Sequence, residues 1–209
     1  MKKIAQISSV LALSAAVAAP AMADISANVG LVSDYFYRGV DQGVGATGSF
    51  GLDWEEGGFY LGTWAADVSD GAEVDLYGGY IAELGDFTIG AGLTGYYYTG
   101  DFDQTYEEVN LYAGFKFLSL EYSVGKHETT AGDEEDYTYL AATIEHNGFY
   151  GTYGTYGSAF DGNHFDLGYG TEVGGFDVST YVTFADDDLT GSKNGDASIV
   201  FGLSKTFDL

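Results

Sequence analysis

The residues of this chain best suited to chemistry are carboxylates that recur at every second position of alternating segments. In residues 73–84, for example, Glu73 and Asp75 alternate with Val74 and Leu76. Successive side chains of a β-strand point to opposite faces, so such acids share one face. Carboxylates that line a water-filled interior attract cations and repel anions. The residues that the alternation assigns to this inner face are Asp34, Arg38, Asp53, Glu73, Asp75, Glu108, Glu121, Asp166, Glu172 and Asp177.

Arg38 is the one basic residue in the interior of an expected strand, since Lys126 and Lys205 lie at strand ends. A guanidinium group pairs bidentately with carboxylates, so Arg38 could clamp an anionic group or set a constriction. The simpler interpretation, which we favour, is a salt bridge to an acid on a neighbouring strand. The candidates for this partner are Asp34, Asp53 and Asp75. In either case, the surrounding acids should immobilise the arginine.

Acids also crowd three connections between the alternating segments. Clustered oxygen ligands can bind calcium, or bridge through divalent ions to the phosphates of lipopolysaccharide. None of the clusters has the spacing of an EF-hand loop. We therefore expect solvated loops, with loop-bound calcium as the alternative, and no other metal or cofactor. The clusters are Asp101, Asp103, Glu107 and Glu108, then residues 133–136, and then residues 186–188.

The three histidines, His127, His146 and His164, are the candidates for enzymatic chemistry. We expect His127 and His164 to lie beside acids at one rim of the fold. The chain has no nucleophile elbow, no zinc-binding histidine spacing and no cysteine. The sequence therefore predicts that the protein is not an enzyme.

The elements that position these residues are strands, because apolar and polar residues alternate with a period of two along almost the whole chain. Helical spacing fits none of the segments as well. The expected strands are residues 25–38, 46–54, 58–66, 73–84, 87–99, 106–115, 118–126, 136–145, 149–157, 164–173, 176–185 and 197–207. Merging one ambiguous hairpin would reduce the count from twelve to ten.

The connections between these strands alternate between long and short. The short ones, such as Gly85-Asp86 and Gly174-Gly175, suit tight turns, whereas the long ones include residues 39–45, 67–72 and 186–196. In an up-and-down barrel, every second connection lies at the same end. Long loops at one end and tight turns at the other are typical of outer-membrane barrels. A lumen of about twelve strands would be narrow and partly filled by Tyr77, Tyr139 and Tyr181.

The N-terminus has the features of a bacterial signal peptide. Lys2 and Lys3 precede a short apolar stretch and the small-residue sequence Ala21-Met22-Ala23, so we expect cleavage after Ala23. Residues 1–23 are then the signal peptide and residues 24–209 one barrel domain. The net charge of −25 excludes nucleic acid as a partner. The 18 tyrosines and 14 phenylalanines argue against disorder.

Several stretches resemble one family. They are Ser33-Asp34-Tyr35 with Arg38-Gly39, Gly58-Phe59-Tyr60 with Gly62-Thr63-Trp64, residues 73–77 with Gly79-Tyr80, and the closing Ser204-Lys205-Thr206-Phe207. In this order, they are similar to the TorF-type porins, an outer-membrane family of proteobacteria. The resemblance runs from about Asn28 to the C-terminus and implies a porin-like barrel with no catalytic residue. The ending Phe207-Asp208-Leu209 departs from the terminal aromatic residue that is usual in such barrels.

Together, these observations predict an all-β protein, a transmembrane up-and-down antiparallel β-barrel in the bacterial outer membrane. The expected function is passive diffusion of small hydrophilic solutes or ions, with a preference for cations. The alternative is a plugged barrel with a structural or adhesive role, acting through its acidic loops. The expected partners are outer-membrane lipid, lipopolysaccharide and the solutes themselves. No outward patch indicates a subunit interface, so the oligomeric state is left open.

Overall fold

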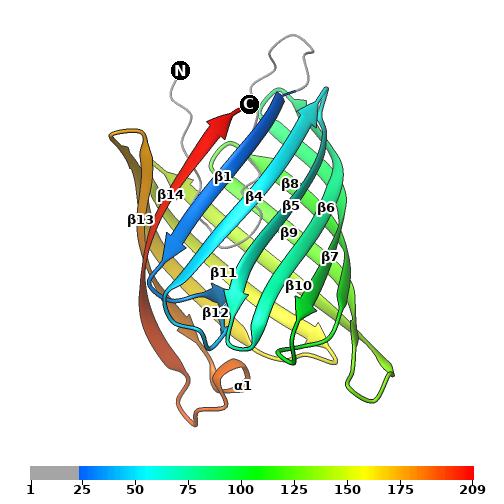
Figure 1. Ribbon diagram of the computed structural model, residues 1–209. Helices are drawn as coiled ribbons and strands as arrows, with labels where there is room; N and C mark the ends of the chain where they lie inside the picture. The colour runs from blue at the N-terminus through cyan, green and yellow to red at the C-terminus, as the bar shows by residue number, and fades with distance from the viewer. Residues whose placement is uncertain (1–23) are drawn as a thin grey trace.

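In the computed structural model, which describes residues 24–209, twelve antiparallel strands close into a barrel (Figure 1). The expected signal peptide, residues 1–23, lies outside the described residues. The barrel strands are β1 (Asp24–Val32), β4 (Thr47–Glu56), β5 (Phe59–Val68), β6 (Gly71–Leu84), β7 (Phe87–Thr99), β8 (Tyr106–Phe115), β9 (Leu118–Glu128), β10 (Glu134–His146), β11 (Phe149–Ser158), β12 (Asn163–Val173), β13 (Phe176–Ala185) and β14 (Asp196–Asp208). The count of twelve is confirmed, and the alternative of ten is wrong.

The topology is up-and-down throughout. Each barrel strand pairs with the next one along the chain, and β1 closes the ring by pairing with β14, with Ser26 opposite Asp208 and Gly30 opposite Ser204. Every strand of the ring therefore has two neighbours and no unpaired edge. No helix among residues 24–209 has the length and hydropathy needed to cross a bilayer.

Tight turns occupy the end of the barrel at which β1 begins and β14 ends (Figure 1). The pairs Gly57-Gly58, Asn147-Gly148 and Gly174-Gly175 all have positive φ, as a type I′ hairpin turn requires. The opposite end carries the longer connections, including the β13–β14 connection with the short helix α1 (Asp187–Thr190). One expected long loop is absent there. Strands β5 and β6 run on to Val68 and Gly71, so residues 67–72 contain only a two-residue turn, Ser69-Asp70.

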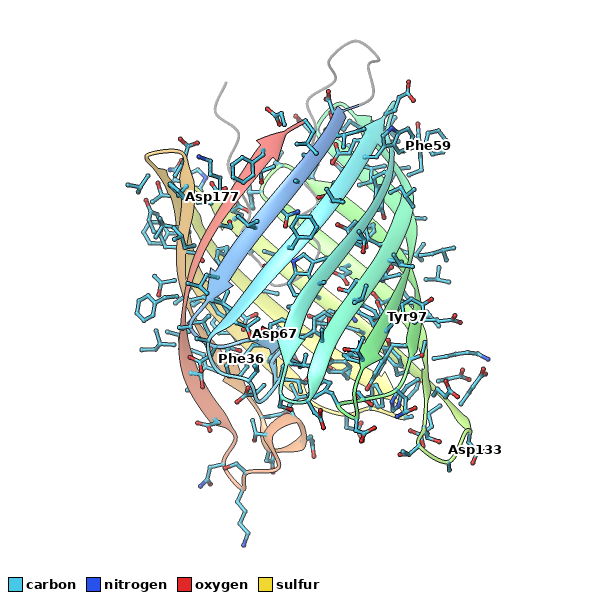
Figure 2. All side chains as sticks on the ribbon, viewed as in Figure 1. Phe36, Phe59, Asp67, Tyr97, Asp133 and Asp177 are labelled. Carbon is cyan, nitrogen blue, oxygen red and sulfur yellow. The ribbon has the colours of Figure 1, made fainter. Side chains whose placement is uncertain are left out.

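Large apolar side chains cover the outside of the barrel. Leu61, Leu93, Phe149 and Ile199 are 62%, 63%, 62% and 58% exposed, whereas Asn110 and Ser123 are 1% and 0% exposed. Phe59 and Tyr97 project outward from the wall in the same way (Figure 2). This distribution is the reverse of that in a water-soluble β-protein, where the apolar face is the buried one.

The first strand is shorter than the sequence predicts. Alternation continues through Tyr35 and Tyr37, but β1 ends at Val32 and the chain then folds inward as a small hairpin, β2 (Phe36–Tyr37) and β3 (Val40–Asp41). Arg38 and Gly39 form its turn, with φ of 48° and 83°. We call residues 33–46 the inner hairpin. Arg38 therefore lies at the tip of this hairpin. The prediction that it belongs to a barrel strand is wrong.

Candidate functional site

The tip of the inner hairpin is anchored inside the barrel by Arg38. Its guanidinium donates to both oxygens of Glu108 on β8, over 2.5 Å from Nη1 and 3.1 Å from Nη2. Nη2 also donates to Glu121 and Ser123 on β9, over 2.6 and 3.2 Å. Two parallel bonds to one carboxylate form the bidentate arrangement that is strongest for arginine. The predicted salt bridge is therefore present, but its partners are Glu108 and Glu121 and not Asp34, Asp53 or Asp75.

Two aromatic rings complete the surroundings of the guanidinium. Its carbon lies 4.1 Å from the ring centroid of Tyr139 and 4.9 Å from that of Tyr37. Cations are attracted to the faces of aromatic rings at such distances, and more strongly where water is excluded. Arg38 is only 3% exposed, so both the ionic and the aromatic contacts act away from water.

The wall of the barrel holds Glu108 in place independently of Arg38. Tyr137 donates to one carboxylate oxygen over 2.8 Å, while Asn110 and Tyr96 donate to the other over 2.7 and 3.2 Å. These residues belong to β10, β8 and β7. The amide nitrogen of Asn110 lies 2.9 Å from the Ser123 hydroxyl and links the Glu108 bonds to those of β9. The carboxylate is thus oriented by strands that the hairpin does not belong to.

The remaining contacts of the inner hairpin reach other sides of the barrel. The hydroxyl of Tyr35 donates to Glu73 on β6 over 3.0 Å, and that of Tyr37 lies 2.6 Å from the Tyr96 hydroxyl on β7. Phe36 packs in an apolar cluster with Tyr181 on β13 and Val200 on β14. Because these contacts come from strands all around the ring, the hairpin occupies the lumen itself.

Gly39 allows the hairpin tip to approach β12. A Cβ atom at this position would lie 2.5 Å from the Cβ of His164, closer than side chains tolerate. Nε2 of His164 lies 2.9 Å from the hydroxyl of Tyr139, the tyrosine that stacks on Arg38, and Nδ1 lies 3.2 Å from Asp166. The hairpin tip therefore fits against β12 as well as against β8 and β9.

Aromatic side chains lie at the loop end, beside this network. Tyr106 stacks on His127 with ring centroids 4.2 Å apart, and Phe160, from the β11–β12 connection, stacks on Tyr137 at 4.7 Å. His127 and Tyr106 both contact the carboxylate of Asp103, over 3.1 and 2.7 Å. His127 is thus part of a packed aromatic group beside an acid.

The predicted lining residues fall into three groups. Glu73, Asp75, Glu108 and Arg38 are buried in the loop-end half of the lumen, and Glu121 is partly exposed beside them. Asp53, nearer the turns, accepts hydrogen bonds from Asn28 and Tyr77 over 3.0 and 2.5 Å. The others do not join the Arg38 network: Asp34 and Asp166 are partly buried, and Glu172 is opposite Asp177 near the tight turn of β12 and β13.

The uncharged members of the network were missed by the sequence analysis. They are Tyr96, Asn110, Ser123 and Tyr137, whereas Tyr139 was expected in the lumen but not beside Arg38. A signal for them exists, since Asn110 and Ser123 each follow a lining acid by two positions. Of the three tyrosines expected to fill the lumen, Tyr139 and Tyr181 are 2% and 8% exposed. Among residues 24–209, no group of three or more acids and histidines is arranged to hold a metal ion.

The connection that contains α1 is ordered by one aspartate. Asp186 accepts hydrogen bonds from the Leu189 amide over 3.2 Å and from the backbone and side-chain nitrogens of Asn163, each over 2.8 Å. Burial acts to raise the pKa of the Asp186 carboxyl, but hydrogen bonds from Asn163 and Leu189 outweigh it and lower that pKa. In contrast, the charge of Asp187 raises the pKa of its exposed neighbour Asp188.

Comparison with known proteins identifies a family without a known role. The model of the family described as "Bacterial protein of unknown function (Gcw_chp)" matches residues 15–207. This match does not support the TorF label, which stays a prediction. No curated protein is significantly similar to the chain.

Solved structures with a similar fold include membrane proteins. One, described as "Unveiling the Mechanism Behind the in-meso Crystallization of Membrane Proteins", has a TM-score of 0.61 at 11% identity and covers 89% of this chain and 84% of its own. The outer membrane protein OpdK from Pseudomonas aeruginosa has a TM-score of 0.43 at 13% identity, and the match covers 79% of this chain and 58% of OpdK. OccK2 (OpdF) from the same organism has a TM-score of 0.40 at 15% identity, and the match covers 89% of this chain and 61% of OccK2. At these identities, the first likeness concerns the fold alone.

Proposed function

This chain belongs to the Gcw_chp family of bacterial proteins of unknown function, and we propose that it forms a porin-like channel of the outer membrane. The channel would admit small hydrophilic solutes or ions and prefer cations. In the conformation described above, it is closed by the inner hairpin. The observation that carries this proposal is an apolar outer wall around a polar, acidic lumen whose loop-end half contains a latched hairpin.

The outer wall supports the membrane location. The middle of each strand presents residues such as Leu52, Leu93, Leu167 and Phe201 outward, and each is more than a third exposed. A lysine or arginine at the bilayer midplane costs about 2–4 kcal/mol in such barrels. Outward charges on this wall, such as Lys126, Asp136 and Lys205, occur near the strand ends. A continuous apolar belt of this kind supports a lipid environment around the barrel.

The two ends of the barrel support an orientation. Outer-membrane barrels have short turns on the periplasmic side and longer loops outside the cell. By this rule, the turn at Gly174-Gly175 would face the periplasm and the connection containing α1 would face the exterior. The acidic connections, including the one that carries Asp133 (Figure 2), would then lie near lipopolysaccharide, where divalent ions could join them to its phosphates.

The charges of the lumen support a cation preference. Glu73, Asp75, Glu108 and Glu121 are acids of the lumen, and Arg38 forms ion pairs with Glu108 and Glu121. Carboxylates in a narrow pore raise the local concentration of cations and oppose the entry of anions. Displacing Arg38 from the lumen would leave Glu108 and Glu121 without their cation and available to passing ions. The inner hairpin therefore controls both the width and the charge of the proposed pore.

The same hairpin favours a second candidate, a permanently plugged barrel with a structural or adhesive role. Tyr35, Phe36 and Arg38 are each less than a tenth exposed, as in a packed core. If the hairpin never leaves, the acidic loops would be the functional surface. The two candidates differ in whether removing the hairpin produces a conducting pore.

The test compares two chains in planar bilayers under a salt gradient. One is the chain from Asp24 onward, and the other has residues 34–45 replaced by a short glycine-serine linker. The channel proposal expects low or intermittent conductance from the first chain. The second should conduct steadily, with a reversal potential that favours cations. A linker variant that inserts fully and stays silent would favour the plugged barrel.

A further inference from the structure

We propose that the lumen contains a binding site for guanidinium groups, formed by Glu108, Glu121, Ser123 and Tyr139. In the closed barrel Arg38 fills this site as an internal ligand. A solute that bears a guanidinium group would fill it when the inner hairpin leaves. This inference rests on the proposed function, because such a solute reaches the site only through an opened lumen.

The geometry of the site fits a planar, forked cation. Both oxygens of Glu108 accept from Arg38, while Glu121 and Ser123 accept from the same nitrogen, Nη2, on another side. The face of the cation lies 4.1 Å from the Tyr139 ring centroid. A guanidinium can form these bonds and stack at the same time, whereas an ammonium is a point charge without a plane. The site therefore selects guanidinium over ammonium compounds.

The site is built before any ligand enters. Tyr96, Asn110 and Tyr137, all on the barrel wall, orient the Glu108 carboxylate, and Ser123 donates to Glu121 over 3.2 Å. Tyr139 is held by its hydrogen-bonding contact with His164. Removing Arg38 therefore leaves oriented carboxylates with no cation between them. A buried charge left in this way is strongly unfavourable, so a replacement cation should bind.

The internal ligand is attached in a way that allows exchange. The strands of the inner hairpin pair with each other, Phe36 with Asp41 and Tyr37 with Val40. Its base is joined to the wall by the Ser33 amide, which donates to the Phe201 carbonyl over 2.9 Å. The hydrogen bonds of its tip described above are made by the side chain of Arg38. A ligand on a short flexible linker has an effective concentration in the millimolar range, and the further contacts of the hairpin raise it, so a free solute must be supplied above that range to compete.

The inference gives the proposed channel a substrate class. Small solutes with a guanidinium group would be drawn by the lumen acids and would bind where Arg38 now lies. Their binding would also hold the inner hairpin away, because both cannot occupy Glu108 at once. The same carboxylates would then serve as the latch of the closed state and as the solute site of the open state.

The experiment measures binding of methylguanidinium to detergent-folded barrels by calorimetry. The variants are Arg38→Ala, which empties the site, and Arg38→Ala with Glu108→Gln, which also removes the main carboxylate. We expect methylguanidinium to bind Arg38→Ala and to bind the double variant at least about tenfold more weakly. Methylammonium should bind Arg38→Ala more weakly than methylguanidinium. Absence of binding, equal binding to both variants, or equal binding of both cations would overturn the inference.

Refolding provides a second readout if the emptied site prevents folding. In that case methylguanidinium in the refolding buffer should restore the folded yield of Arg38→Ala, and methylammonium should not. Failure to restore it, while the double variant folds, would also overturn the inference. Conductance without added cation separates this inference from the channel proposal. An Arg38→Ala barrel that conducts but does not bind methylguanidinium refutes the site alone, and one that binds but stays silent refutes the channel alone.

Discussion

Arg38 and Glu108 are 70 positions apart in the chain, yet they form a buried bidentate ion pair with bonds of 2.5 and 3.1 Å. Arg38 belongs to the inner hairpin and Glu108 to β8, so the pair connects the contents of the lumen to its wall. Because both side chains are almost fully excluded from water, neither charge can be satisfied by solvent once the pair is broken. This pair is therefore a central link between the inner hairpin and the barrel wall.

Loss of the arginine should destabilise the barrel strongly. Arg38→Ala leaves Glu108 buried without its cation, and breaking a buried pair in this way costs about 3–5 kcal/mol. Adding Glu108→Gln should recover a large part of this loss, because the uncompensated charge is then removed. Denaturant unfolding in lipid vesicles, followed by tryptophan fluorescence, measures the unfolding free energies of the single and the double variant. Equal losses for the single and double variants would show that the ion pair is not the reason for the effect.

The hairpin turn should be sensitive to a single methyl group. Gly39→Ala adds a Cβ that would lie 2.5 Å from the Cβ of His164, in addition to the strain of an alanine at φ of 83°. Gly45→Ala is a matched control, because its φ is 69° and no atom lies within 4 Å of the added Cβ. We expect Gly45→Ala to lower the free energy of unfolding by about 1–2 kcal/mol, and Gly39→Ala to lower it by a further 1–3 kcal/mol. Similar unfolding free energies for the two variants would contradict the placement of the hairpin against β12.

The proposed membrane location predicts that the cost of an outward-facing arginine depends on its depth in the bilayer. Leu93, in the middle of β7, and Leu84, beside a tight turn, are 63% and 59% exposed on the outside of the barrel. In lipid vesicles, Leu93→Arg should cost about 2–4 kcal/mol of unfolding free energy and Leu84→Arg about 0–1 kcal/mol. If water surrounded the outside of the barrel, neither substitution would be costly. Equal effects at the two positions would argue against a bilayer around the barrel.

The connection that contains α1 should respond to acid through Asp186. Its pKa is lower than usual, so the hydrogen bonds that it accepts contribute stability above the ordinary aspartate pKa of about 3.9. That contribution is lost as the pH falls through the lowered pKa of the folded state. Carbon NMR titration should place the midpoint of Asp186 below that of Asp188, whose pKa is raised. The reverse order would show that the bonds from Asn163 and Leu189 do not form in solution.

Most of the barrel could be predicted because its strands are local patterns. Residues 87–99 and 176–185 each alternate without interruption from a tight turn to a longer connection, and the structure gives the same bounds to β7 and β13. Turn pairs such as Asn147-Gly148 mark the ends of strands through the positive φ that they require. The loop at residues 67–72 was predicted too long because Asp67 and Ala72 extend the ladder with an ordinary strand conformation.

The inner hairpin could not be predicted in this way. Tyr35 and Tyr37 continue the alternation of β1, so period two alone cannot distinguish a long wall strand from a hairpin that folds back into the lumen. The turn signal was Arg38-Gly39, and only its glycine is typical of such turns. Neighbouring strands were the natural place to seek a partner for Arg38. Glu108 and Glu121 contact Arg38 only because the ring closes and the hairpin crosses the lumen. Neither of these features is local in sequence.

The most direct test of a gated channel is the conductance of Arg38→Ala in planar bilayers under a salt gradient. Lys126→Ala is the matched control, since Lys126 is an exposed basic residue that pairs with Glu134 outside the lumen. We predict that Arg38→Ala conducts more than the parent chain and shifts its reversal potential toward cations, while Lys126→Ala conducts like the parent. An Arg38→Ala barrel that is folded and inserted but conducts no better than the parent would contradict the account.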